Sequence, residues 1–193
     1  MKKLSYVIFT ALAIYALQGC SSNTKSGQST DSVTKDSTTK ISTVVDSTKI
    51  DSGDVKFADN AAAGGMAEIE LSKLAQQKST STSVKNFAAM MVKDHGAAGD
   101  SLMIIAKKKN ITLPTAMDAD HQKKYDDMSK LSGADFDKAY VNAMVDDHQG
   151  ALKLMQDASI NCKDADLKNF AGKVVVTVQM HLDAANKLKT GMK

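Results

Sequence analysis

Arginine and tryptophan are both absent from the 193 residues, and lysine supplies the 25 basic side chains that face 22 acidic ones. Without arginine, the chain has no guanidinium group for bidentate contacts to guanine or phosphate. A formal charge of +3 is also too small to give the strong positive field of a nucleic-acid-binding domain. We therefore expect no nucleic-acid partner.

Proline and aromatic residues are scarce as well. Pro114 is the only proline, beside 5 phenylalanines and 4 tyrosines. An all-β sandwich needs frequent turns and aromatic-rich strands, so this composition argues against one. The chain also has no Gly-x-Ser-x-Gly, no Gly-x-Gly-x-x-Gly and no Gly-x-x-x-x-Gly-Lys-Ser/Thr sequence. A nucleophile elbow and the two common phosphate loops are thereby excluded.

The N-terminal residues have the pattern of an export signal. Two lysines precede a mostly apolar stretch at residues 4–17, and Leu17-Gln-Gly-Cys20 comes next. The stretch is shorter than the roughly 20 apolar residues of a transmembrane helix and predicts a signal peptide over 1–19. Its end resembles the lipobox of bacterial lipoproteins, which implies cleavage before Cys20 and a lipid on its thiol. The alternative is an ordinary secretory signal followed by a chance cysteine.

Residues 20–54 differ in composition from the C-terminal part of the chain. Nearly half are serine or threonine, and large apolar side chains are few. Such a segment buries too little apolar surface to offset its ordering entropy. We predict a flexible tether over 20–54 that joins the lipid to a folded domain over 55–193. With Cys20 acylated, Cys162 is the one remaining thiol, and we interpret it as incidental.

From Val55 onward, apolar residues recur with the period of a helix. The pattern predicts long helices at about 55–78, from about 83 to Lys109, from Ser132 onward and from Asp164 onward, with a shorter helical piece within 115–131. Asn110 and Asp164 have the residue types that end and begin helices. Gly64-Gly65 lies within the first helix at a cost of about 1 kcal/mol per glycine relative to alanine, and we expect it to let a neighbouring helix approach closely.

Four amphipathic helices with this spacing predict an all-α bundle. The first and last pairs are joined by short loops, so each pair forms an antiparallel hairpin. The middle connection, by contrast, is long enough to cross the bundle. The second and third long helices then run parallel, which is the ferritin-like four-helix arrangement with a long crossover and a short extra helix.

Each long helix carries one polar residue in its core-facing seam. They are Glu68, His95, His148 and His181. Glu68, His95 and His148 lie near the middle of their helices, and His181 lies about a turn further along. We therefore expect one carboxylate and three imidazoles to converge. Burying them unpaired is costly, and either a transition-metal ion or a hydrogen-bonded Glu–His network would compensate. Copper, zinc, iron and manganese are the candidate ions. The Glu-x-x-His pair of di-iron bundles is absent, which disfavours a di-iron centre.

Residues beside the seam histidines offer further ligands. Asp94 and Asp147 could bind the ion, orient imidazoles of neighbouring helices, or lie on a solvated helix edge. Met91 and Met144 share the face of the histidines and would suit copper(I), although methionine at this spacing is also common core filler. His121 lies in the middle connection, so we expect it to be exposed and outside the site.

Several segments together are distinctive. They are Ala62-Ala-Gly-Gly-Met-Ala-Glu-Ile-Glu-Leu-Ser-Lys-Leu-Ala75, Phe87-Ala-Ala-Met-Met-Val-Lys-Asp-His95, Phe136-Asp-Lys-Ala-Tyr-Val-Asn-Ala-Met-Val-Asp-Asp-His148 and His181-Leu. They resemble the bacterial family called domain of unknown function 4142, over about residues 56–189. The resemblance implies a ferritin-like bundle and an exported or outer-membrane protein, with family positions at Glu68, at the two Asp-His pairs and at His181. It implies no function.

Three hypotheses for function remain open. The first is an exported protein, lipid-anchored in the envelope and most simply at the outer membrane, that binds a transition metal in the bundle core. The second is a non-catalytic envelope interaction or stress protein with a buried Glu–His network and no metal. The third, ranked last because no substrate pocket is identifiable, is a small redox enzyme using the same site. The sequence leaves the oligomeric state open.

Overall fold

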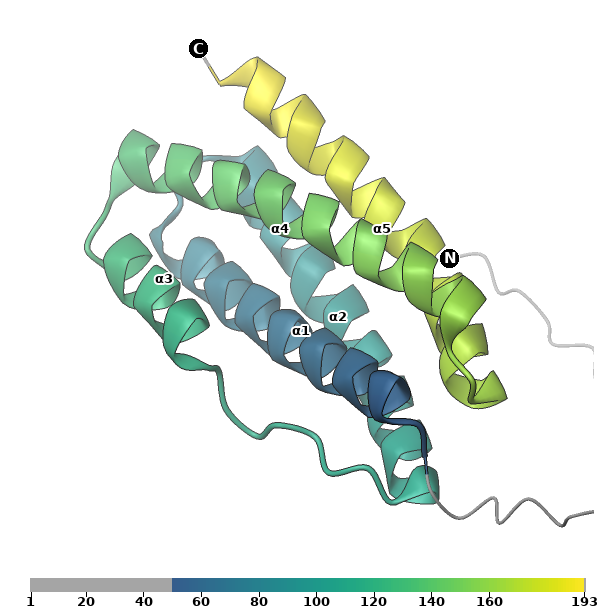
Figure 1. The fold of residues 1–193 in the computed structure, drawn as a ribbon. Helices are drawn as coiled ribbons and strands as arrows, with labels where there is room; N and C mark the ends of the chain where they lie inside the picture. Colours follow the sequence, from purple (N-terminus) through teal and green to yellow (C-terminus); the bar gives the residue numbers. More distant parts are fainter. Residues whose placement is uncertain (1–49, 193) are drawn as a thin grey trace, which may run out of the picture. The chain divides into compact units, whose positions relative to one another are not determined.

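The computed structural model describes residues 50–192, which form five α-helices and no strand. The helices are α1 (Ser52–Lys78), α2 (Thr82–Lys109), α3 (Ala119–Ser129), α4 (Gly133–Asn161) and α5 (Ala165–Gly191). The four long helices form a bundle, and the short α3 lies beside it (Figure 1). The predicted all-α bundle is therefore confirmed. The predicted signal peptide, Cys20 and nearly all of the tether lie outside the described residues, and no helix within them is long and apolar enough to cross a membrane.

The order of the helices around the bundle is that of a crossover topology. The helix α1 packs against α2 and α4, and α5 packs against α4 and α2, so α2 and α4 lie on a diagonal. The chain leaves α2 at one end of the bundle, returns along α1 as α3, and enters α4 at the other end (Figure 1). As a result, α2 and α4 run parallel, as predicted from the length of the connection.

Local capping explains most of the helix bounds. The Asp51 side chain accepts a hydrogen bond from the Gly53 amide at 2.8 Å, so α1 begins at Ser52, earlier than the apolar pattern indicates. Asn110 ends α2 in the left-handed region, with φ 56°, as expected of a C-cap asparagine. Before α4, however, Ser132 makes no capping hydrogen bond through its side chain, and Gly133 makes the turn with φ 56°.

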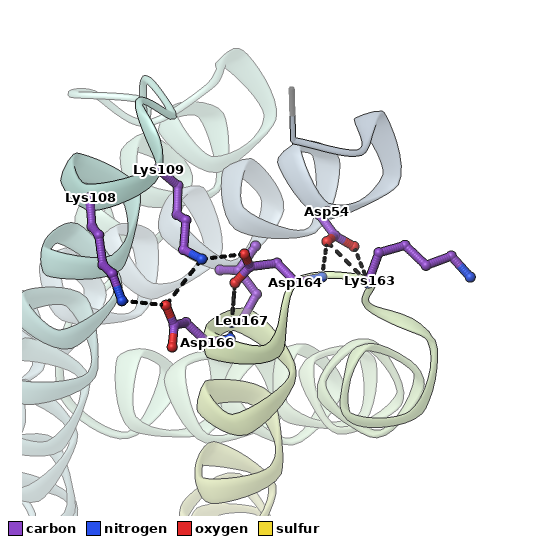
Figure 2. A network of polar contacts seen from close by, with 7 residues as sticks. All are labelled: Asp54, Lys108, Lys109, Lys163, Asp164, Asp166 and Leu167. Carbon is purple, nitrogen blue, oxygen red and sulfur yellow. Dashed lines mark hydrogen bonds and ion pairs between the residues drawn. The ribbon is translucent and has the colours of Figure 1, made fainter. Parts of the chain in front are cut away.

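One end of the bundle is fastened by a buried carboxylate. The Asp54 side chain accepts hydrogen bonds from the backbone amides of Lys163 at 3.0 and 3.1 Å and Asp164 at 2.6 Å (Figure 2). Lys109 then bridges Asp164 at 2.5 Å and Asp166 at 3.1 Å. These contacts join the start of α1, the end of α2 and the α4–α5 turn. The folded bundle therefore begins before Val55.

The neighbouring thiol is buried in the same junction. Cys162 forms the C-cap of α4 and is 6% exposed. Burial, together with the negative charge of Asp54, raises the pKa of the Cys162 thiol to about 12. A thiol in this state is protonated and a poor nucleophile or metal ligand.

The apolar core consists of two clusters stacked along the bundle. One contains Leu71, Phe87, Tyr140 and Leu182, and the other contains Phe57, Leu102, Met155 and Phe170. On every long helix, the polar seam residue lies between these two groups in the chain. A polar layer therefore separates two apolar halves, and the candidate site lies in that layer.

Candidate metal centre

The structure brings together all four polar residues of the seams, one from each long helix. His148 and His181 are fully buried, Glu68 is 5% exposed, and the His95 side chain is 10% exposed. The three imidazole centroids are 5.1 to 5.5 Å apart. One ring nitrogen from each histidine lies within 4.8 Å of the nitrogens from the other two. His181 thus lies level with the others rather than a turn beyond them.

Glu68 lies between two of these histidines. Its Oε2 is 3.1 Å from Nδ1 of His95, and its Oε1 is 3.1 Å from Nδ1 of His148. Burial, and then the negative charge of Asp147, raise the pKa of Glu68 to about 8 against an opposing effect of Lys124. Near neutral pH the carboxyl group therefore retains its proton when no cation is bound.

The same burial lowers the pKa of two of the histidines, His95 and His148. The pKa of His95 falls to about 3 because of burial and the neighbouring charges that His148 and His181 would carry. The pKa of His148 falls to about 4, again chiefly through burial and then through His181. Neutral imidazole is the form that binds metal ions, so these two side chains are ready to do so at neutral pH.

The two aspartates that precede the histidines have different partners. Asp94 Oδ2 is 3.0 Å from Nε2 of His181 on the neighbouring helix α5. Asp147, in contrast, pairs with Lys124 of α3 at 2.5 Å. Of the three roles considered for these aspartates, Asp94 orients an imidazole across a helix interface, whereas Asp147 influences the site only by its charge on Glu68.

Each imidazole also has a ring nitrogen that no carboxylate faces. These atoms, His95 Nε2, His148 Nε2 and His181 Nδ1, are buried and have no hydrogen-bond partner. His148 Nδ1, despite its short distance to Glu68, is not aligned for a hydrogen bond either. An unsatisfied buried polar group costs roughly 1–3 kcal/mol. A self-contained Glu–His network would satisfy these atoms, and this arrangement does not.

The remaining candidates are two methionines and His121. Met91 and Met144 are fully buried in the apolar cluster around Phe87, which is the position of core residues. His121, expected to be exposed, is partly covered, with 28% of its side chain accessible. Its Nδ1 lies 2.7 Å from Asp118 Oδ2 at the start of α3.

Two openings reach the polar layer. A cavity of about 410 Å³ lies along the middle of α1, and its lining includes Glu68 and His95. A groove of about 780 Å³ between α2 and α5 is lined by His95 and His181. The expected role of Gly64-Gly65 in close helix packing is wrong, because a Cβ added to either residue would meet no atom within 4 Å. Both glycines line the cavity instead.

These features define an all-α bundle with a buried carboxylate and three buried imidazoles at its centre. The chain belongs to the family described as Domain of unknown function (DUF4142), which matches residues 40–188. The family resemblance noted in the sequence is thereby confirmed. A search of curated protein sequences gives no match.

Solved structures show a similar fold at low sequence identity. A DUF305 fragment from Deinococcus radiodurans superposes with a TM-score of 0.65 at 12% identity, covering 73% of this chain and 97% of that one. The Cu(II)-bound form of CopM gives 0.63 at 14% identity, covering 72% and 97%. The Ag-bound form of CopM gives 0.59 at 15% identity, covering 72% and 96%. At these identities the likeness establishes the shared fold.

Proposed function

We propose that this protein binds one transition-metal ion through His95, His148 and His181. The observation that carries the proposal is the set of three buried imidazoles, each with an unpartnered nitrogen and with ring nitrogens within 4.8 Å of one another. Bound metal would satisfy atoms that are otherwise costly to bury. Three protein ligands also leave a coordination position open to a further ligand.

The carboxylates complete this arrangement. Histidine ligands commonly turn their second nitrogen toward a carboxylate, which orients the ring and increases its basicity. Glu68 faces His95 and His148 in this way, and Asp94 faces His181. An arriving cation would also favour the ionised form of Glu68, so that metal binding releases a proton.

The set of donors favours copper, zinc or iron over manganese. Imidazole suits these three metals, whereas manganese prefers carboxylate and water oxygens. Copper is further supported by the fold, because CopM, which shares it, has been solved in Cu(I)-bound, Cu(II)-bound and Ag-bound forms. The buried methionines play no part in this proposal, since they lie in the apolar core.

The expected location gives this site a role. The predicted signal peptide would direct export, and the predicted lipid on Cys20 would hold the bundle in the cell envelope. A metal-binding bundle tethered there would sequester an incoming ion or deliver it to another protein. We favour this role over catalysis, because sequestering or delivering an ion requires no exposed substrate-binding surface beside the imidazoles.

Binding titrations test the proposal directly. Full-length protein without a polyhistidine tag is titrated with Cu⁺ held by a competing chelator, with Cu²⁺ and with Zn²⁺. One tightly bound ion per chain is expected, together with a higher melting temperature. A variant with His95, His148 and His181 all changed to alanine should lose both effects.

Controls separate loss of ligands from loss of fold. Lys93, Gln149 and Gln179 are exposed residues on the same three helices, and changing all three to alanine should leave binding intact. If the triple histidine variant does not fold, the single changes His95→Gln, His148→Gln and His181→Gln keep a polar side chain at each position. Tight binding that survives these changes would refute the proposal.

A further inference from the structure

The cavity around α1 connects the polar layer with the surface. Its inner lining includes Glu68 and His95, and its outer lining includes Asp118, His121 and Asp146. Asp118 and Asp146 are exposed, and His121 is partly exposed. Chain segments from α1, α2, α4, α5 and the start of α3 thus surround one continuous space that ends at a proposed metal ligand.

Small residues create this space. In α1, Ala61-Ala-Ala-Gly-Gly65 has no side-chain atom beyond Cβ, and Gly99 and Gly150 line the cavity from α2 and α4. A Cβ added at Gly64, Gly65, Gly99 or Gly150 would meet no atom within 4 Å. Glycine inside a helix costs about 1 kcal/mol relative to alanine, and no close helix contact offsets that cost here. The glycines keep the space open.

The outer end of the cavity offers donors for a cation. His121 Nδ1 lies 2.7 Å from Asp118 Oδ2, which repeats the carboxylate–imidazole pairing of Asp94 and His181. In this geometry the His121 Nε2 is the nitrogen left for a ligand. Carboxylates of Asp118 and Asp146 give the entrance a negative potential, which raises the local concentration of cations.

The alternative route, through the groove between α2 and α5, is less suited to a cation. Lys108 and Lys173 line this groove together with Ile104 and Met180, and the charges of the two lysines are offset by Asp94 and Asp166 in the same lining. Ile104 is 70% exposed and Met180 is 48% exposed. A groove with no net negative charge and with exposed apolar side chains attracts a hydrated metal ion less than the acidic entrance of the cavity does.

We propose that metal ions reach the buried imidazoles through the cavity around α1, and that Asp118 and His121 form a weaker capture site at its entrance. This inference rests on the proposed metal-binding function. The ion first binds Asp118 and His121, and then exchanges these ligands for His95 inside. No redox step is involved, and the ion keeps its charge during the transfer.

Loading kinetics test this route. Cu²⁺ alone is mixed rapidly with full-length protein, and the rise of its ligand-field absorption gives the loading rate. Gly64→Leu places a large side chain in the cavity and should slow loading by at least about 10-fold, since binding then requires a conformational change. The final affinity of this variant should match that of the wild type. Gly172→Leu, on an exposed part of α5 outside the cavity, is the matched control and should load normally.

The entrance is tested separately. His121→Ala should remove a weak second binding event and slow loading at low ionic strength by about 10-fold, with a smaller effect at high salt. Should Gly64→Leu fail to fold, Gly150→Leu fills the same cavity from α4. Normal affinity with unchanged loading rates in the Gly64→Leu, Gly150→Leu and His121→Ala variants would overturn the proposed entry route and leave the proposed metal-binding function intact.

A blocked groove provides the opposite comparison. Thr177 lines only the groove between α2 and α5, so Thr177→Leu should leave the loading rate unchanged. Slower loading in this variant than in Gly64→Leu would assign entry to the groove and contradict our proposal. Absence of any tight binding to the wild type would instead contradict the proposed function, and with it this inference.

Discussion

The two Asp-His pairs, on α2 and α4, share the same sequence pattern but have different surroundings. Phe87 precedes Asp94-His95 by the same spacing as Tyr140 precedes Asp147-His148. Both histidines reach the polar layer and contact Glu68. The aspartates diverge, since Asp94 faces His181 while Asp147 pairs with Lys124. Equal spacing gives the histidines equal positions without giving the aspartates equal roles.

The short helix α3 explains this difference. It packs mainly against α1 and α4, and there it supplies Lys124 to Asp147. On α2, Asp94 faces His181 of the neighbouring helix α5 instead. A pattern on one helix determines which groups that helix offers. The neighbouring elements determine which of these groups reach the site.

His95 and His148 should contribute equally to metal binding, and removing either one should lower metal affinity more than any other change considered below. His95→Ala and His148→Ala should each lower metal affinity by more than about 100-fold, because loss of a ligand exceeds the 10- to 100-fold typical of its carboxylate partner. Competition titrations with a chelator of known affinity measure the change. If one variant binds as tightly as the wild type, the two helices do not contribute equally.

The two aspartates should differ in how much they support metal binding. Asp94→Asn removes the charge that orients His181, and we expect metal affinity to fall by roughly 10- to 100-fold. Asp147→Asn is the matched control, and its affinity should stay within about 3-fold, as for a charge that does not contact a ligand. The same titrations apply. Equal losses in the two variants would show that Asp147 also supports the site.

The aromatic positions of the two motifs differ by a hydroxyl group. Tyr140 Oη and Ser72 Oγ are 2.8 Å apart in the core, where Phe87 has no such partner. Ser72→Ala leaves the Tyr140 hydroxyl buried and unpaired, so the free energy of unfolding should fall by about 1–3 kcal/mol. Adding Tyr140→Phe should restore part of the loss. Urea denaturation of the single and double variants measures this, and an unchanged Ser72→Ala would contradict it.

The buried cluster should also give the metal-free protein a pH optimum. Below an ordinary histidine pKa of 6.5 the unfolded chain gains protons that folded His95 and His148 do not bind, so acid favours unfolding. Glu68 acts in the opposite sense, since the folded state retains its proton up to about pH 8 while the unfolded state loses it above 4.5. Between pH 4.5 and 6.5 the two histidines outweigh the one carboxyl group.

The contribution of this cluster to stability should therefore peak near pH 6.5. From pH 6.5 to 8, the free energy of unfolding should fall by about 1 kcal/mol per pH unit because of Glu68. Glu68→Gln cannot lose a proton and should remove this alkaline loss while keeping the acid one. Urea denaturation across pH 5 to 8 provides the comparison, and parallel curves for the two proteins would disprove the assignment to Glu68.

Much of this arrangement is predictable from the sequence because it depends on helical period. A repeat of 3.6 residues places Glu68, His95, His148 and His181 in core-facing seams, and the length of the middle connection predicts the crossover. The caps at Asn110 and Asp164 also follow from residue type alone.

The remainder depends on contacts between distant segments. The role of Lys124 is not predictable, because nothing local to it shows that α3 packs beside Asp147. The expectation of close packing at the α1 glycines is wrong because a glycine pair is equally compatible with a tight contact and with an open space. Only the positions of α2 and α4 around Gly64 distinguish these two possibilities.

X-ray absorption spectroscopy of the copper-loaded, full-length protein tests the central claim most directly. Three nitrogen scatterers at about 2.0 Å with the outer-shell pattern of imidazole are expected, as for histidine bound to similar metals. This pattern should be absent from the variant that lacks His95, His148 and His181. Sulfur scatterers at about 2.3 Å, or a shell of oxygens without imidazole, would contradict metal binding by the three histidines.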